Sequence, residues 1–184
     1  MIKKYYLYLI IIVFFTLSLK WFLSISEFGL NINSLSLYNL KDTQYFPIVY
    51  SLSDFNFSPT YMEEIHAEKI IGFPLLGALV HSLLFGQIGI YSFIILEYIF
   101  QIIFLTIVFK VFIKIFEEHR KSFYFLICLM LLSSVVEVLS IYYDSWEFQN
   151  LHSLLENNLG TRFPRPLITG ILIFLTFYYI LDFQ

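Results

Sequence analysis

The stretch GIYSFIILEYIFQIIFLTIVF, residues 89–109, decides the fold class, because nearly every side chain in it is apolar. A helix of about 20 apolar residues crosses the ~30 Å hydrocarbon core of a lipid bilayer. Three further runs have a similar length and composition, at residues 5–24, 122–142 and 167–183. The sequence therefore predicts an all-α integral membrane protein with about four transmembrane helices.

The overall composition supports this prediction. Apolar residues make up 59% of the chain and charged residues 14%, whereas soluble domains are about 45–50% apolar and about 25% charged. The net charge of −3 provides no basic surface for nucleic acid. A single cysteine, Cys128, is too few for a disulfide framework or a cysteine-ligated zinc site. The composition thus excludes a water-soluble domain and a nucleic-acid partner, and it indicates contact with membrane lipid.

A shorter apolar run at residues 70–85 determines the predicted topology, because counting it as a span inverts every later segment. Glycine and proline near its start suit a re-entrant or interfacial helix better than a clean span. With this run outside, six basic residues face the cytoplasm and four face outward; with it spanning, the numbers are four and six. The tendency of basic residues to stay in the cytoplasm favours the first arrangement, with a cytoplasmic N-terminus. The predicted organisation is one transmembrane module, residues 1–184, with outer loops at residues 25–88 and 143–166 and an interfacial helix at residues 70–86.

Two aspartates in the first outer loop are candidate catalytic residues. Asp42 lies in KDTQYFPIVY, residues 41–50, and Asp54 lies in SLSDFNFSP, residues 51–59. A carboxylate near the outer membrane surface can act as a general base toward a sugar hydroxyl or hold a divalent metal ion. The alternative is a local role, in which Asp42 caps a short helix and Asp54 belongs to a turn. The residues leave both interpretations open, and a divalent ion is the one cofactor that they suggest.

Two arginines precede the last apolar run. Arg162 and Arg165 lie in GTRFPRPLITG, residues 160–170, where two prolines hold the chain extended. Guanidinium groups at a membrane surface suit bidentate binding of phosphate. The alternative is that both arginines anchor the chain to lipid headgroups. Basic residues are disfavoured on the outer side, so this pair is a candidate substrate-binding site.

Ionisable residues inside the predicted spans point to specific contacts. Glu97 and Glu137 each cost about 2–3 kcal/mol or more at the middle of a bilayer. Glu97 and Gln101 share a helix face, which predicts a polar contact between helices. His81, within the short apolar run, is expected to be a packed histidine rather than a ligand.

The order of these features resembles the amino-terminal module of the C-type (GT-C) glycosyltransferase superfamily, which includes protein mannosyltransferases and aminoarabinose transferases. In that pattern a first span precedes an outer loop with a key acid, then a surface segment, then a span with a basic cytoplasmic end. Here FPLLGALVHSLLFG, residues 73–86, resembles the surface segment, and residues 89–114 resemble the span, with Lys110 and Lys114 as its basic end. The sequence departs from the pattern in two places: Thr43 follows the first aspartate where a second acid is usual, and Pro74 stands alone where two prolines are usual.

The resemblance implies part of a membrane enzyme that moves a sugar from a polyprenyl-phosphate donor to an acceptor on the outer face of a bacterial inner membrane. Asp42, or else Asp54, would be the catalytic base or metal contact, and Arg162 and Arg165 would lie near the donor phosphate. Members of that superfamily have several more spans, so we expect the chain to be the amino-terminal part of a longer protein and inactive alone. The alternative is a small non-enzymatic membrane protein, an assembly or transport-related subunit that binds another membrane protein.

Overall fold

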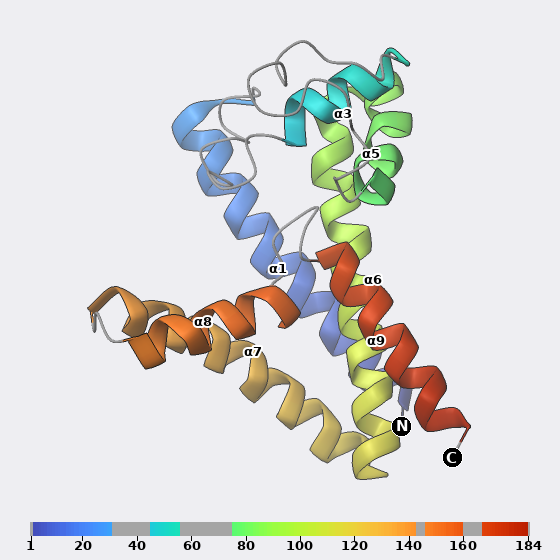
Figure 1. The fold of residues 1–184 in the computed structure, drawn as a ribbon, viewed down its shortest axis with the longest axis vertical. Helices are drawn as coiled ribbons and strands as arrows, with labels where there is room; N and C mark the ends of the chain where they lie inside the picture. The colour runs from blue at the N-terminus through green and yellow to red at the C-terminus, as the bar shows by residue number, and fades with distance from the viewer. Residues whose placement is uncertain (1, 31–44, 56–74, 143–145, 160–166, 184) are drawn as a thin grey trace. The chain divides into compact units, whose positions relative to one another are not determined.

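The computed structural model describes residues 2–30, 45–55, 75–142, 146–159 and 167–183 (Figure 1). Within these ranges the chain forms helices and no strand, which confirms the predicted helical class. The helices are α1 (Ile2–Phe28), α3 (Tyr45–Ser53), α5 (Leu75–Ile88), α6 (Tyr91–Phe116), α7 (His119–Tyr142), α8 (Trp146–Leu159) and α9 (Leu167–Asp182).

Two helices are long and apolar enough to cross a membrane. They are α1, over Lys3–Leu23, and α6, over Tyr91–Phe116. Only 22% and 39% of their most apolar windows are buried, although a long helix in the core of a soluble protein is mostly buried. Phe14, Phe15 and Phe22 of α1 are 64%, 68% and 69% exposed. Length and exposure together favour helices that face lipid.

The other two predicted spans also fall on helices. Residues 122–142 lie within α7, and residues 167–183 coincide with α9 up to Asp182. α9 has 16 residues and is therefore about 24 Å long, shorter than the ~30 Å hydrocarbon core.

The predicted interfacial helix at residues 70–86 corresponds to α5, which runs from Leu75 to Ile88. Residues 70–74 lie outside the described part of the chain. α5 has 14 residues and is about 21 Å long, so it is too short to cross a bilayer by itself.

The helices form two compact units, and α1 and α6 each contribute to both. Unit 1 holds Met1–Phe14 and Ile99–Gln184, and unit 2 holds Phe15–Tyr98. Each unit is described by itself below.

In unit 2, α3 packs against α5. The buried apolar side chains of α3 are Ile48, Val49 and Leu52. A tight turn joins α5 to α6: Gly89 has a φ of 58°, in the left-handed region that glycine adopts readily, and its N–H donates to the carbonyl of Phe85. The turn brings the ring centroid of Phe85 to 5.8 Å from that of Phe93. The end of α5 is therefore packed against the beginning of α6.

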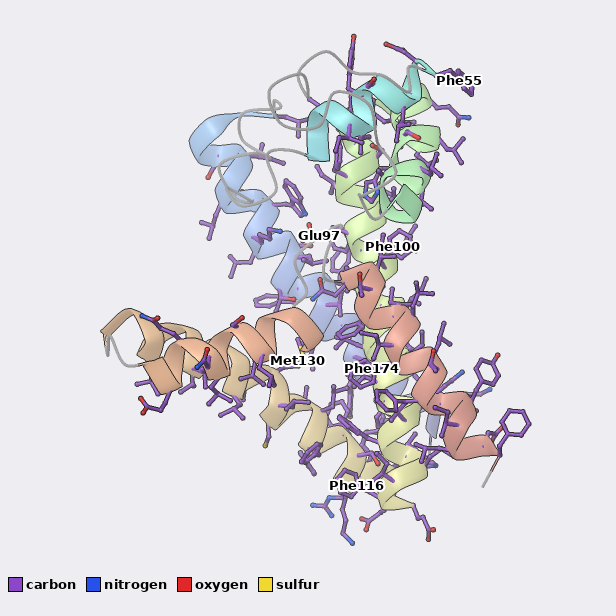
Figure 2. All side chains as sticks on the ribbon, in the orientation of Figure 1. Phe55, Glu97, Phe100, Phe116, Met130 and Phe174 are labelled. Atoms are coloured by element: carbon purple, nitrogen blue, oxygen red, sulfur yellow. The ribbon has the colours of Figure 1, made fainter. Side chains whose placement is uncertain are left out.

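In unit 1, aromatic side chains join the helices. The ring of Tyr6 in α1 lies 5.4 Å from Phe109 in α6, and Phe109 lies 6.3 Å from Phe123 in α7. Phe104 of α6 lies 5.8 Å from Phe174 of α9, which is labelled in Figure 2. Edge-to-face packing of this kind stabilises helix contacts beyond simple burial.

Unit 1 also contains a helix that the sequence analysis did not predict. α8 lies within the predicted outer loop at residues 143–166 and packs against α7 and α9. Phe148, Leu151 and Leu155 recur at helical spacing, and Leu155 is buried. Glu147, in the first turn, interacts favourably with the positive end of the helix dipole. The connection between α7 and α9 is therefore largely helical.

Candidate functional site

A buried carboxylate links α1 to α6 in unit 2. Glu97 of α6 is 3% exposed, and Figure 2 shows it between these two helices. Its Oε1 accepts a hydrogen bond from Lys20 Nζ at 2.6 Å, and its Oε2 accepts one from Trp21 Nε1 at 2.8 Å. The predicted polar contact between helices is thus confirmed for Glu97.

The partners of Glu97 come from one turn of α1. Lys20 Nζ also lies 5.1 Å from the centroid of the Trp21 ring, a cation–π contact. On the same two helices, the hydroxyls of Ser18 and Tyr98 lie 3.0 Å apart. Ser18 thus pairs with Tyr98 and Lys20 pairs with Glu97. A higher residue number in α1 goes with a lower one in α6, so the two helices are antiparallel here.

This arrangement assigns Glu97 a positioning role. Both carboxylate oxygens accept hydrogen bonds from α1, so neither is open to a substrate. Sequence reasoning missed Lys20 and Trp21. Lys20 was nevertheless visible as the one charged residue within the apolar run at residues 5–24. The side chain of Glu137 lies outside the described part of the chain.

His81 is packed where α5 meets α6. The residue is fully buried, its ring is stacked on Phe93 with centroids 5.3 Å apart, and its Nδ1–H donates to the carbonyl of Gly77 at 2.6 Å. Burial lowers the pKa of His81 to about 4, so the imidazole is neutral at pH 7. These contacts agree with the predicted packed histidine.

Asp54 lies in a turn at the end of α3. The N–H of Asp54 donates to the carbonyl of Ser51 at 3.2 Å, and Phe55 follows with a φ of 56°. Its side chain is exposed and forms no hydrogen bond or ion pair with another described residue. A carboxylate at the negative end of a helix dipole does not stabilise that helix. Asp54 is therefore in the predicted turn, and its carboxylate is also open to a substrate.

The remaining predicted site residues lie outside the described part of the chain. These residues are Asp42, Arg162 and Arg165. Among the described residues, no group of three His, Cys, Asp or Glu side chains is arranged to hold a metal ion. The suggested divalent ion thus has no ligand set in this part of the chain.

Comparison of the chain with protein-family models, with curated protein sequences and with solved structures found no match. Its functional assignment consequently rests on its own residues and on the order in which they occur.

Proposed function

We propose that the chain is part of a membrane glycosyltransferase of the GT-C type, which moves a sugar from a polyprenyl-phosphate donor to an acceptor at the outer face of a bacterial inner membrane. The observation that carries the proposal is the open carboxylate of Asp54, held at the end of α3 by the packing of α3 on α5. This is the segment in which the resemblance expects the catalytic acid.

The antiparallel pairing of α1 and α6 supports the topology that this function needs. If α1 and α6 cross the membrane in opposite directions, the end of α1 and the start of α6 lie on the same side. The segment that connects them then begins and ends on that side. α5, which lies within that segment, is too short to cross the bilayer. Asp54 then faces the same side as the ends of both helices, and the distribution of basic residues makes this the outer side.

Each candidate residue has a definite role in the transfer of the sugar. Asp42 or Asp54 takes the proton of the acceptor hydroxyl while the oxygen of that hydroxyl bonds to the anomeric carbon of the sugar. The bond from that carbon to the phosphate oxygen of the donor breaks, and polyprenyl phosphate leaves. Arg162 and Arg165 bind the phosphate group and stabilise its charge.

A second candidate function, a non-enzymatic assembly subunit, is favoured by the Lys20–Glu97 pair. In this pair two ionisable side chains join α1 to α6, which is the role that this alternative expects for charged residues within apolar helices. In that case Asp54 would be a surface residue of the first outer segment, where a partner protein would bind.

Release of polyprenyl phosphate distinguishes the two functions without knowledge of the acceptor. Membranes from cells that produce the protein from its own gene would be given a panel of synthetic polyprenyl-phosphate hexoses and pentoses, and the product would be measured by mass spectrometry. We expect release from at least one donor, above membranes that lack the protein and above those with Asp54→Asn and Asp42→Asn together. Equal release in all three membranes would support the assembly subunit.

A further inference from the structure

Three helices of unit 1 meet around an aromatic cluster at one end. Tyr5 of α1 lies 6.3 Å from Phe109 of α6 and 5.3 Å from Phe123 of α7, measured between ring centroids. Tyr8, one turn further along α1, lies 6.2 Å from Phe123. Phe109 is fully buried between them. These contacts fix the first turns of α1 and α7 side by side.

Two cations form cation–π contacts with tyrosines beside this cluster. Lys4 Nζ lies 5.4 Å from the ring centroid of Tyr8, and the guanidinium carbon of Arg120 lies 5.7 Å from that of Tyr124. Tyr124 is also close enough to Lys4 to interact with it electrostatically. Lys4, from α1, therefore interacts with both tyrosines, and Arg120, from α7, interacts with Tyr124.

These two cations differ from Lys114 and Lys121, which have acidic partners. Lys114 is paired with Asp182, and Lys121 is paired with Glu118 at 2.7 Å. Lys4 and Arg120 are exposed and form no ion pair with any other residue that the structure describes. Two positive charges without acidic partners at one end of the unit attract an anion.

We infer that Lys4 and Arg120, with Tyr8 and Tyr124, bind the phosphate of an anionic phospholipid headgroup. The guanidinium fork of Arg120 suits a phosphate, and Lys4 adds a second positive charge. Tyr8 and Tyr124 are 38% and 55% exposed, and tyrosines with this exposure are typical of the headgroup level of a membrane.

The aliphatic surface of α1 indicates that the anion belongs to a lipid. Leu7 and Ile11, in the turns that follow Lys4, are 55% and 53% exposed. An acyl chain can lie along this surface while its headgroup reaches the two cations. The inference rests on the membrane placement in the proposed function, but it does not depend on sugar transfer.

Competition between two lipids tests this site. The intact protein, purified in mild detergent, would be incubated with equal amounts of phosphatidylglycerol and phosphatidylcholine that carry the same acyl chains. Native mass spectrometry would then give the ratio of the two bound lipids. Each basic residue near an anionic membrane surface contributes about a factor of five in affinity. We therefore expect Lys4→Gln with Arg120→Gln to lower the preference for phosphatidylglycerol about twenty-five-fold.

The matched control is Lys114→Gln with Lys121→Gln, which removes two positive charges from the same end of unit 1. Those cations already have acidic partners, so the preference for phosphatidylglycerol should change much less. An equal loss of preference in both double variants would overturn the site. Inorganic phosphate at millimolar concentration should not displace the lipid, and complete displacement would also overturn the assignment to a lipid. Retention of both lipids without preference would contradict this inference alone. Retention of neither would contradict the membrane placement itself.

Discussion

Lys20 of α1 and Glu97 of α6 form an ion pair in which Nζ lies 2.6 Å from Oε1. The carboxylate is the more buried partner, with 4% of its side chain exposed against 25% for Lys20. Removal of Lys20 would leave the charged group with a single hydrogen-bond donor, Trp21 Nε1. The contact between α1 and α6 therefore includes an ion pair in which the carboxylate is much more buried than the ammonium.

Lys20→Met should destabilise the protein strongly. Removal of one partner from a buried pair costs about 3–5 kcal/mol, and the partial exposure of Lys20 places the expected loss near 3 kcal/mol. The double variant Lys20→Met with Glu97→Leu should recover most of this loss, because it leaves no buried charge. Thermal unfolding of the purified protein in detergent measures both effects.

The control for this prediction is Lys110→Met, which removes an exposed lysine from the same helix that carries Glu97. Its effect should stay within about 0.5 kcal/mol. If Lys20→Met is equally mild, the ion pair does not hold α1 against α6.

Stability should fall at low pH because of His81. Burial lowers the pKa of His81 from 6.5 to about 4, so the unfolded chain takes up a proton at a higher pH than the folded protein. The stability that depends on neutral His81 is fully present above pH 6.5 and is lost as the pH falls to 4, by about 3 kcal/mol. His81→Gln keeps an N–H donor but does not titrate. The difference in unfolding midpoint between the two proteins, measured from pH 4 to pH 8, should therefore vary with pH, and a constant difference would contradict the prediction.

Cysteine labelling in intact cells tests the proposed topology. Cys128 is free and exposed, so the background is Cys128→Ser. A membrane-impermeant maleimide should label Asp54→Cys and should not label His119→Cys until the cells are opened. Labelling of position 119 in intact cells would invert the arrangement. It would also move Asp54 to the cytoplasm.

Replacement of the catalytic aspartate by asparagine, as Asp42→Asn or else Asp54→Asn, should abolish sugar transfer and leave the protein folded. The amide keeps the shape of the side chain but cannot accept the proton, and loss of a general base typically costs about 10²–10⁴ in rate. Transfer is measured as release of polyprenyl phosphate. If Asp42→Asn stays active and Asp54→Asn does not, the base is Asp54. Activity in both variants would remove the main chemical support for a glycosyltransferase.

Arg162→Lys and Arg165→Lys should weaken donor binding without affecting membrane insertion. Lysine keeps the charge but lacks the planar fork, and a hydrogen bond to a charged group is worth about 1.5–3 kcal/mol. Titration with a polyprenyl-phosphate sugar should show at least about a tenfold lower affinity. An unchanged affinity in the double variant would leave both arginines as membrane anchors.

The helices and one key contact could be predicted from the sequence because each depends on local pattern. The apolar runs predict helices, and the energetic cost of a carboxylate inside a span predicts that Glu97 has a partner. The identity of that partner could not be predicted. α1 is apolar on all sides, so nothing in its periodicity marks the face that is buried against α6.

α8 was missed for the opposite reason. Its composition is mixed, and polar residues such as Gln149 and Asn150 lie between two strongly apolar runs, which is typical of a loop. The helix is nevertheless amphipathic, because Phe148, Leu151 and Leu155 recur at helical spacing, and it packs against α7 and α9. The turn at Asp54 was predictable from local sequence, but its place beside the α3–α5 contact was not.

The short hairpin of α5 and α6 has a consequence for the order in which the protein assembles. His81 and Phe85 meet Phe93 across the two-residue turn at Gly89, so this contact closes within microseconds once the segment is synthesised. The pair between α1 and α6 instead joins residues 77 positions apart, and a ribosome needs roughly 4–15 s to add them. Until then the ammonium of α1 has no carboxylate, and its long side chain keeps it at the lipid–water boundary. In the proposed membrane placement, α6 would therefore enter the bilayer already packed against α5, and it would bring the partner of Lys20 to a helix that is already inserted.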